Sequence, residues 1–131
     1  MTIELRMLAL SVAVGLVHVV AASHFASSQR GYRWTASSRD EPVEPLPGVA
    51  GRLDRALRNF LETFSLFAAV VLSAHAAGSH SALTEWGARL YFWGRVAYLP
   101  LYAAGIPLVR SLVWNVATAG ILLFLVVLLW G

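Results

Sequence analysis

Cysteine and lysine are both absent from the 131 residues, and charged residues are scarce. Without cysteine there can be no disulfide, no thiolate metal site and no cysteine nucleophile. Hydrophobic residues make up 58% of the chain and charged residues 13%, and the mean hydropathy is +0.66. Ten basic and seven acidic side chains are too few to cover the surface of a soluble domain of this length. The composition therefore excludes an ordinary soluble globule and predicts an integral membrane protein.

Four apolar stretches are long enough to cross a bilayer as helices, which takes about 20 residues each. We place them at about residues 5–27, 53–77, 83–104 and 109–130, with one long polar loop at residues 28–52. The other links are short and contain glycine or proline, as is typical between antiparallel helices. The sequence predicts an all-α fold, with residues 1–131 forming a single domain built as a four-helix up-and-down membrane bundle.

The first apolar stretch also has features of a secretory signal peptide, because residues 21–23 read Ala-Ala-Ser. Its apolar part is longer than is usual for such a peptide, and Glu4 lies in its charged region, which favours a retained helix. All ten basic residues are arginine, and those near helix ends are concentrated at the 28–52 loop and at Arg110. The positive-inside rule therefore predicts a multi-pass protein with this loop in the cytoplasm and both termini on the opposite side. Because the arginines form no long solvated run, we expect no nucleic-acid partner.

Polar residues within three of the stretches recur at helical spacing. One face of the second stretch carries Arg55, Arg58, Asn59 and Glu62. One face of the third carries Tyr91, Arg95, Tyr98 and Tyr102. Arg110 and Ser111 begin the fourth stretch at the same end of the bundle. The three polar faces are therefore predicted to converge on one region.

The charges in this region are unbalanced, since four arginines meet one carboxylate, Glu62, while Asp54 lies off the polar face. An ionised side chain at the bilayer centre costs about 2.5 to 3.5 kcal/mol on insertion scales, so the surplus needs partners. Arginine binds carboxylates bidentately and tolerates partial dehydration, which favours a site for a small molecule bearing carboxylate or phosphate groups. The alternative is that the cluster only fixes the register of the helices.

Small residues recur every fourth position on another face of the second stretch, at Ser65, Ala69, Ser73 and Ala77. Such a face allows close approach of another helix, either within the chain or from another subunit. The four histidines, His18, His24, His75 and His80, lack the spacing that would put two of them on one helical face. We therefore expect no metal site.

Two segments resemble the MAPEG family, the membrane-associated proteins in eicosanoid and glutathione metabolism. The segment GRLDRALRNFLETF, residues 51–64, is similar to the family's signature, and GRVAYLPLYAAGIPLVRS, residues 94–111, is similar to its third-helix and fourth-helix region. With four spans and a long first cytoplasmic loop, the resemblance covers most of the chain, and the member that it resembles is of the bacterial type. The resemblance implies a homotrimer that binds glutathione in a cleft between neighbouring subunits, near the cytoplasmic face.

The resemblance also implies roles for individual residues. The family's second-helix glutathione ligands match Arg55, Arg58, Asn59 and Glu62, with the glutamate pairing the amino group. Tyr102 matches a glutathione-contacting tyrosine, and its neighbours on the same face, Arg95 and Tyr98, join the expected binding set. Arg110 matches an arginine proposed to stabilise the thiolate, and Ser111 follows it as in the prostaglandin-forming member; we expect this pair to be catalytic. The chain departs from the family at Gly51, which replaces a glutamate, and from the prostaglandin-forming member at Tyr98, which replaces a histidine.

A cation beside a thiol in a poorly hydrated site favours the thiolate. The resemblance therefore predicts a glutathione-dependent transferase or peroxidase that acts on hydrophobic electrophiles, with glutathione as cosubstrate. Because the family includes a non-catalytic lipid-binding member, the alternative is a lipid-binding or scaffold subunit of a membrane complex. In either case the expected partners are further copies of the chain and a membrane lipid or hydrophobic small molecule.

Overall fold

The computed structural model describes all 131 residues and contains five helices and no strand, which confirms the all-α prediction. The four long helices are α1 (Ile3–Arg30), α3 (Gly48–Ala76), α4 (Ala82–Ala103) and α5 (Pro107–Trp130). They coincide with the four predicted stretches to within a few residues. The prediction missed α2 (Tyr32–Ala36), which is a single short helix within the polar loop.

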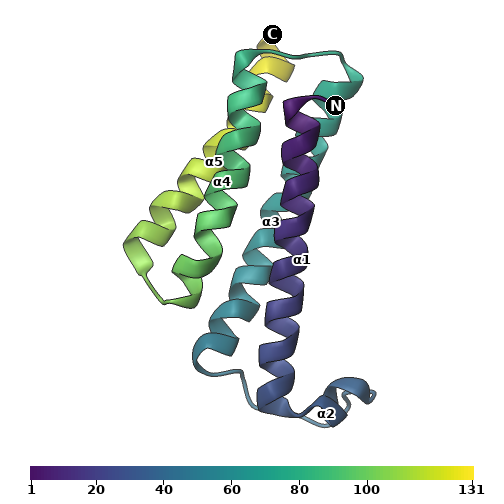
Figure 1. The fold of residues 1–131 in the computed structure, drawn as a ribbon, viewed down its shortest axis with the longest axis vertical. Helices are drawn as coiled ribbons and strands as arrows, with labels where there is room; N and C mark the ends of the chain where they lie inside the picture. The colour runs from purple at the N-terminus through teal and green to yellow at the C-terminus, as the bar shows by residue number, and fades with distance from the viewer.

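Successive long helices alternate in direction, and both termini lie at one end of the molecule (Figure 1). Helix α4 contacts the other three long helices, whereas α1 and α5 do not contact each other. Toward the end that carries α2, the α4–α5 pair diverges from α1 and α3 (Figure 1). The molecule is therefore closed near the termini and open between α3 and the α4–α5 pair.

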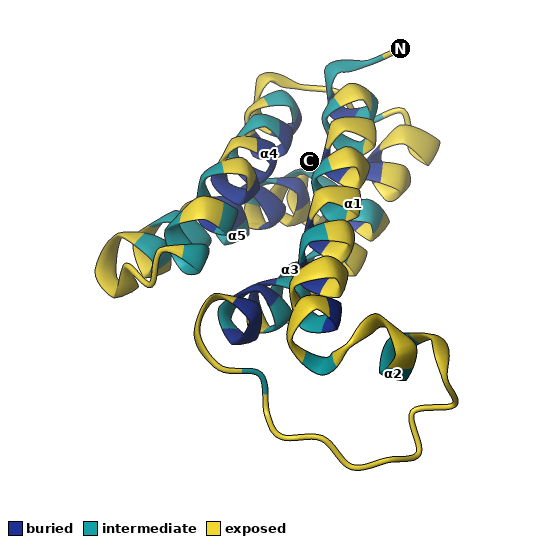
Figure 2. Cartoon of the chain, turned by 60° about the horizontal axis from the view of Figure 1, so that its bottom comes forward, coloured by how far each residue is buried: buried dark blue, intermediate teal, exposed yellow.

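The apolar core fills the closed part, where α3, α4 and α5 meet. The rings of Phe67 and Tyr91 stack there with centroids 4.0 Å apart. Gly87 and Gly120 let the backbones of α4 and α5 touch, because a Cβ on Gly87 would lie 2.6 Å from the Gly120 carbonyl oxygen. Buried residues line the inner faces of the helices and exposed residues cover the outer ones (Figure 2). The close α4–α5 contact fixes the point from which the open end diverges.

A polar cluster at the same closed end links α1 to α4. Thr84 donates a 2.6 Å hydrogen bond to Glu4, and the His80 ring nitrogen lies 3.4 Å from the same carboxylate oxygen. Glu4 is buried, with 4% of its surface exposed. Glu4, which the sequence placed in a charged flank of the first stretch, is thus a buried carboxylate that links α1 to α4.

Three of the helices, α1, α3 and α5, are long and apolar enough to cross a membrane. Helix α4 is not, because it carries Glu85, Arg89 and Arg95. Because α4 contacts all three other long helices, Arg95 is fully buried, and its Nε and Nη2 atoms have no hydrogen-bond partner within the chain. The small-residue face of α3 is exposed at Ser65, Ala69, Ser73 and Ala77, so it does not pack within the chain. Of the two alternatives for this face, packing within the chain is wrong.

Candidate functional site

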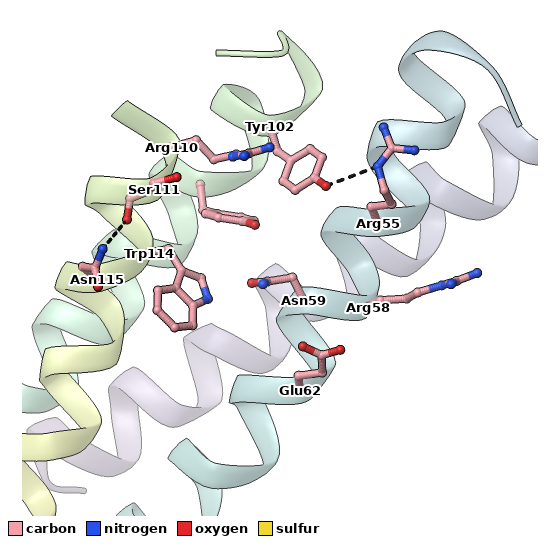
Figure 3. A pocket seen from close by; sticks show the side chains of 10 residues that line it. Arg55, Arg58, Asn59, Glu62, Tyr102, Arg110, Ser111, Trp114 and Asn115 are labelled. Atoms are coloured by element: carbon pink, nitrogen blue, oxygen red, sulfur yellow. Dashed lines mark hydrogen bonds between the residues drawn. The ribbon is translucent and has the colours of Figure 1, made fainter. Parts of the chain in front are cut away.

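A cavity of about 450 Å³ lies at the open end, between α3 and the α4–α5 pair. Eight of the nine predicted site residues line it: Arg55, Arg58, Asn59 and Glu62 from α3, Tyr98 and Tyr102 from α4, and Arg110 and Ser111 from α5. Two further residues of α5, Trp114 and Asn115, complete the lining (Figure 3). Its volume is within the range of about 300 to 1,000 Å³ that is typical of small-molecule sites.

The α3 wall is positioned by a close contact at the start of the helix. A Cβ on Gly51 would collide with the carbonyl oxygen of Leu46 in the preceding loop, so only glycine fits there. One turn further on, the helical spacing that sequence analysis identified turns Arg55, Asn59 and Glu62 toward the cavity.

The opposite wall depends on the turn between α4 and α5. Gly105 has a φ of 75°, in the left-handed region that favours glycine, and Pro107 begins α5. Arg52 of α3 donates a 2.9 Å hydrogen bond to the carbonyl of Ala103 at the end of α4. The turn places Arg110 in the first turn of α5, where the helix dipole also favours a negative charge.

Tyr102 lies between two of the cavity's cations. The Arg55 Nε atom donates to its hydroxyl over 3.3 Å, and the Arg110 Cζ atom lies 4.6 Å from its ring centroid. A phenol ring and hydroxyl hold guanidinium groups in place without neutralising them. Arg55 and Arg110 are therefore fixed in the cavity wall with their charges uncompensated.

The ion pairs of Asp54 and Glu62 differ from those expected from the sequence. Asp54 forms an ion pair with Arg58 at 3.1 Å, so the excess of arginines over carboxylates in this region is smaller by one than the sequence indicated. Glu62 forms no ion pair with any arginine. The register-fixing alternative has Glu62 neutralising an arginine, and that pair is absent. The cavity instead presents unpaired guanidiniums together with one unpaired carboxylate, a lining that suits a ligand carrying charges of both signs.

Arg95 is the one predicted site residue that the cavity does not include. It is fully buried behind the wall, where its Nη1 atom donates a 2.7 Å hydrogen bond to Oδ1 of Asn59. Its Cζ atom also lies 4.1 Å from the ring centroid of Tyr98. A guanidinium only donates, so the Asn59 carbonyl must face Arg95 and its amide nitrogen is left for the cavity. The sequence predicts Arg95 as a direct ligand, but in the structure it lies behind the cavity wall and contacts the lining only through Asn59 and Tyr98.

Sequence analysis missed Trp114 and Asn115. The indole nitrogen of Trp114 is buried and has no hydrogen-bond partner within the chain. Asn115 donates to the Ser111 carbonyl over 2.9 Å, and the Ser111 hydroxyl donates to the Pro107 carbonyl over 3.1 Å. Both missed residues lie four positions after predicted ones, Arg110 and Ser111, so helical spacing alone could have identified them.

Comparison with protein-family models matches residues 7–130, nearly the whole chain, to the MAPEG family. A search of curated proteins found no match.

Proposed function

The chain belongs to the MAPEG family, and from this membership and the cavity we propose a membrane-bound glutathione-dependent transferase or peroxidase for hydrophobic electrophiles. The observation that carries the proposal is the charge pattern of the lining. Arg55 and Arg110 have no carboxylate partner, and Glu62 has no cationic partner. Glutathione carries two carboxylates, one ammonium group and a thiol, and these groups complement that pattern.

Each group of glutathione has a counterpart in the cavity. Arg55 and Arg58 bind carboxylates, while the free amide nitrogen of Asn59 donates to a carboxylate or a backbone carbonyl. Glu62 accepts from the ammonium group, and Tyr98 and Tyr102 flank the tripeptide. This assignment uses every charged group that lines the cavity except Arg110, which is left for the thiol.

Arg110 supplies the chemistry by stabilising the thiolate, aided by its place at the start of α5. Ser111 lies beside Arg110. Because its hydroxyl hydrogen is donated to the Pro107 carbonyl, the Ser111 oxygen can only accept a hydrogen bond from bound glutathione. In transfer, the thiolate attacks an electrophilic carbon, a carbon–sulfur bond forms and the leaving group departs with the electron pair. In peroxide reduction, two glutathione molecules and a hydroperoxide give glutathione disulfide, an alcohol and water.

The assembly we propose is a homotrimer of four-helix membrane subunits, with the α2 loop in the cytoplasm and the termini on the other side. Two observations support it. The small-residue face of α3 is exposed and available to a neighbouring helix. The cavity is also open on one side, since Glu62 and Asn115 are both exposed, and a second subunit would close it over these two residues.

Turnover by the purified protein tests the proposal directly. We expect conjugation of glutathione to 1-chloro-2,4-dinitrobenzene, followed by absorbance, or consumption of cumene hydroperoxide. Arg110→Ala should lower kcat/KM by about 100-fold or more, as loss of a group that stabilises developing charge does. Arg33→Ala is the matched control, because Arg33 is exposed on α2 and does not line the cavity.

Ligand binding separates the enzyme from the scaffold alternative. At 100 times its Kd, glutathione adds about 2.7 kcal/mol to the stability of the folded state, so the Tm in detergent should rise. A Tm shift without turnover would leave glutathione binding intact but overturn catalysis. Absence of both would favour the lipid-binding or scaffold alternative.

A further inference from the structure

A second hollow lies on the other side of α3, where α1, α2, the following loop and α3 meet. This groove has a volume of about 260 Å³ and shares no lining residue with the glutathione cavity. One end of it is basic, with Arg30 and Arg39, and the other is apolar, with Val19, Ala22 and Leu57. We call it the α1–α2 groove. Nothing in the proposed function uses it.

The two arginines converge on Trp34 of α2. The Cζ atom of Arg30 lies 5.3 Å from the Trp34 ring and that of Arg39 lies 5.8 Å from it. Neither guanidinium forms an ion pair. Asp54 is the only carboxylate residue in the lining, and it is already paired with Arg58. The Nε atom of Arg30 is buried without a hydrogen-bond partner, so at least one strong donor in the groove is unused.

The backbone at Arg39 shows that this convergence is enforced. Arg39 is the only non-glycine residue with a positive φ, at 62°. The left-handed conformation is uncommon for such a residue and carries strain. Local hydrogen bonds hold it there: the Arg39 amide donates to the Ser37 hydroxyl over 3.1 Å, and its Nε donates to the Thr35 carbonyl over 3.0 Å. The loop thus holds Arg39 in an unfavourable backbone conformation that brings its guanidinium close to the Trp34 ring.

Helix length places the basic end at the depth of lipid head groups. Helix α1 has 28 residues, which gives a length of about 42 Å at the usual rise per residue, whereas the hydrocarbon layer is about 30 Å thick. The last turns of α1, with Arg30, therefore extend into the head-group region. About three turns earlier, Val19 is 45% exposed on an apolar outer face that includes Leu16 and Val20. The groove is thus basic at head-group depth and opens onto apolar surface at acyl-chain depth.

We propose that the α1–α2 groove binds an anionic membrane phospholipid, with the phosphate between Arg30 and Arg39 and the start of an acyl chain against Val19, Ala22 and Leu57. A phosphodiester has one negative charge shared over two unesterified oxygens, and the two guanidiniums can each donate to one of them, while the apolar end favours a ligand with an acyl chain over a fully soluble anion. The expected cytoplasmic side of the loop is also the side where anionic lipids are enriched in membranes.

The test compares lipids and variants of the full-length protein in detergent micelles, by Tm and by native mass spectrometry. Phosphatidylglycerol should raise the Tm and remain bound, whereas phosphatidylcholine and inorganic phosphate should not. Arg30→Gln and Arg39→Gln should each lower the affinity for phosphatidylglycerol about tenfold. Arg33→Gln removes the same charge from the exposed face of α2, outside the groove, and should leave the affinity unchanged.

Each other outcome overturns the proposal. An equal loss in Arg33→Gln would mean that the lipid responds only to overall charge. An equal effect of inorganic phosphate would mean a soluble phosphate site, and no preference over phosphatidylcholine would mean no anion site. If Arg30→Gln fails to fold, Arg39→Gln decides alone, because its exposed loop position carries no core contact. Glutathione turnover does not enter the comparison, so this inference and the proposed function can fail separately.

Discussion

Two polar clusters lie at opposite ends of α4. Near the start of the helix, Thr84 and His80 surround the carboxylate of Glu4, which is buried and accepts a 2.6 Å hydrogen bond. Near its end, Tyr102 lies between Arg55 and Arg110, and the carboxylate of Glu62 forms no ion pair. The first cluster is complete within the chain, whereas in the second Arg55, Arg110 and Glu62 have no ionic partner within the chain.

The packing around the two clusters differs in the same way. At the first, Gly87 and Gly120 allow α4 and α5 to touch, and the apolar core fills the space beside them. At the second, the helices diverge around a cavity of about 450 Å³. Buried polar groups that are satisfied fix a structure, while unsatisfied ones beside a cavity indicate a binding site. The same residue type, glutamate, is therefore buried and hydrogen-bonded at position 4 and exposed without an ion pair at position 62.

The largest expected effect is on the open cluster. Glu62→Ala removes the acceptor for the ammonium group of glutathione, and hydrogen bonds to charged groups contribute about 1.5 to 3 kcal/mol. We expect the KM for glutathione to rise about 10-fold to 100-fold, with no loss of thermal stability because Glu62 has no partner within the chain. Steady-state kinetics and a melting curve measure the two quantities. A fall in Tm with unchanged KM would reverse the assigned roles.

The matching change in the closed cluster should have the opposite result. Glu4→Ala removes the charged acceptor of Thr84, whose hydroxyl keeps only the Ser81 carbonyl at 2.9 Å, and the loss of a hydrogen bond to a charged group costs about 1.5 to 3 kcal/mol of unfolding free energy. Denaturation in SDS mixed micelles measures this loss, and the KM for glutathione of the folded fraction should not change. Glu85→Ala is the control, since its ion pair with Arg89 is at the surface and contributes at most about 1 kcal/mol.

Arg95→Met should change the affinity for glutathione without lowering the stability of the fold. Arg95 is buried in the interior and is hydrogen-bonded to Asn59 in the cavity wall. Without the hydrogen bond to Asn59 the amide is free to rotate, so we expect the KM for glutathione to rise about tenfold, or about 1.4 kcal/mol. Stability should be maintained or raised, because an apolar side chain of similar length replaces a buried charge without an ionic partner. An unchanged KM would show that Asn59 needs no fixed orientation, and unfolding of the variant would show a structural role for Arg95.

Arg95 also shows where sequence reasoning succeeds and where it stops. The spacing of α3 residues such as Asn59 and Glu62 correctly put them on one face, because helical geometry is a local property. The spacing of α4 put Arg95 on the same stripe as Tyr102, and that too is correct for the helix alone. Yet the stripe faces a cavity at Tyr102 and the packed interior at Arg95, because α3 and α5 diverge along its length. Distances between helices are not encoded in the period of one helix.

The smallest expected effect on the KM for glutathione is that of Arg58→Gln. This variant compares a paired, exposed residue of the open cluster with its unpaired residues. The side chain is 74% exposed and paired with Asp54, and it extends away from the α4–α5 wall (Figure 3). An exposed, already paired cation contributes at most about 1 kcal/mol, so Arg58→Gln should raise the KM for glutathione only about twofold to fivefold. The effect should shrink as salt is raised, because exposed charges are screened. A loss as large as that of Glu62→Ala would mean that a neighbouring subunit closes over Arg58 and removes it from solvent, so this measurement on one arginine also tests the proposed trimer.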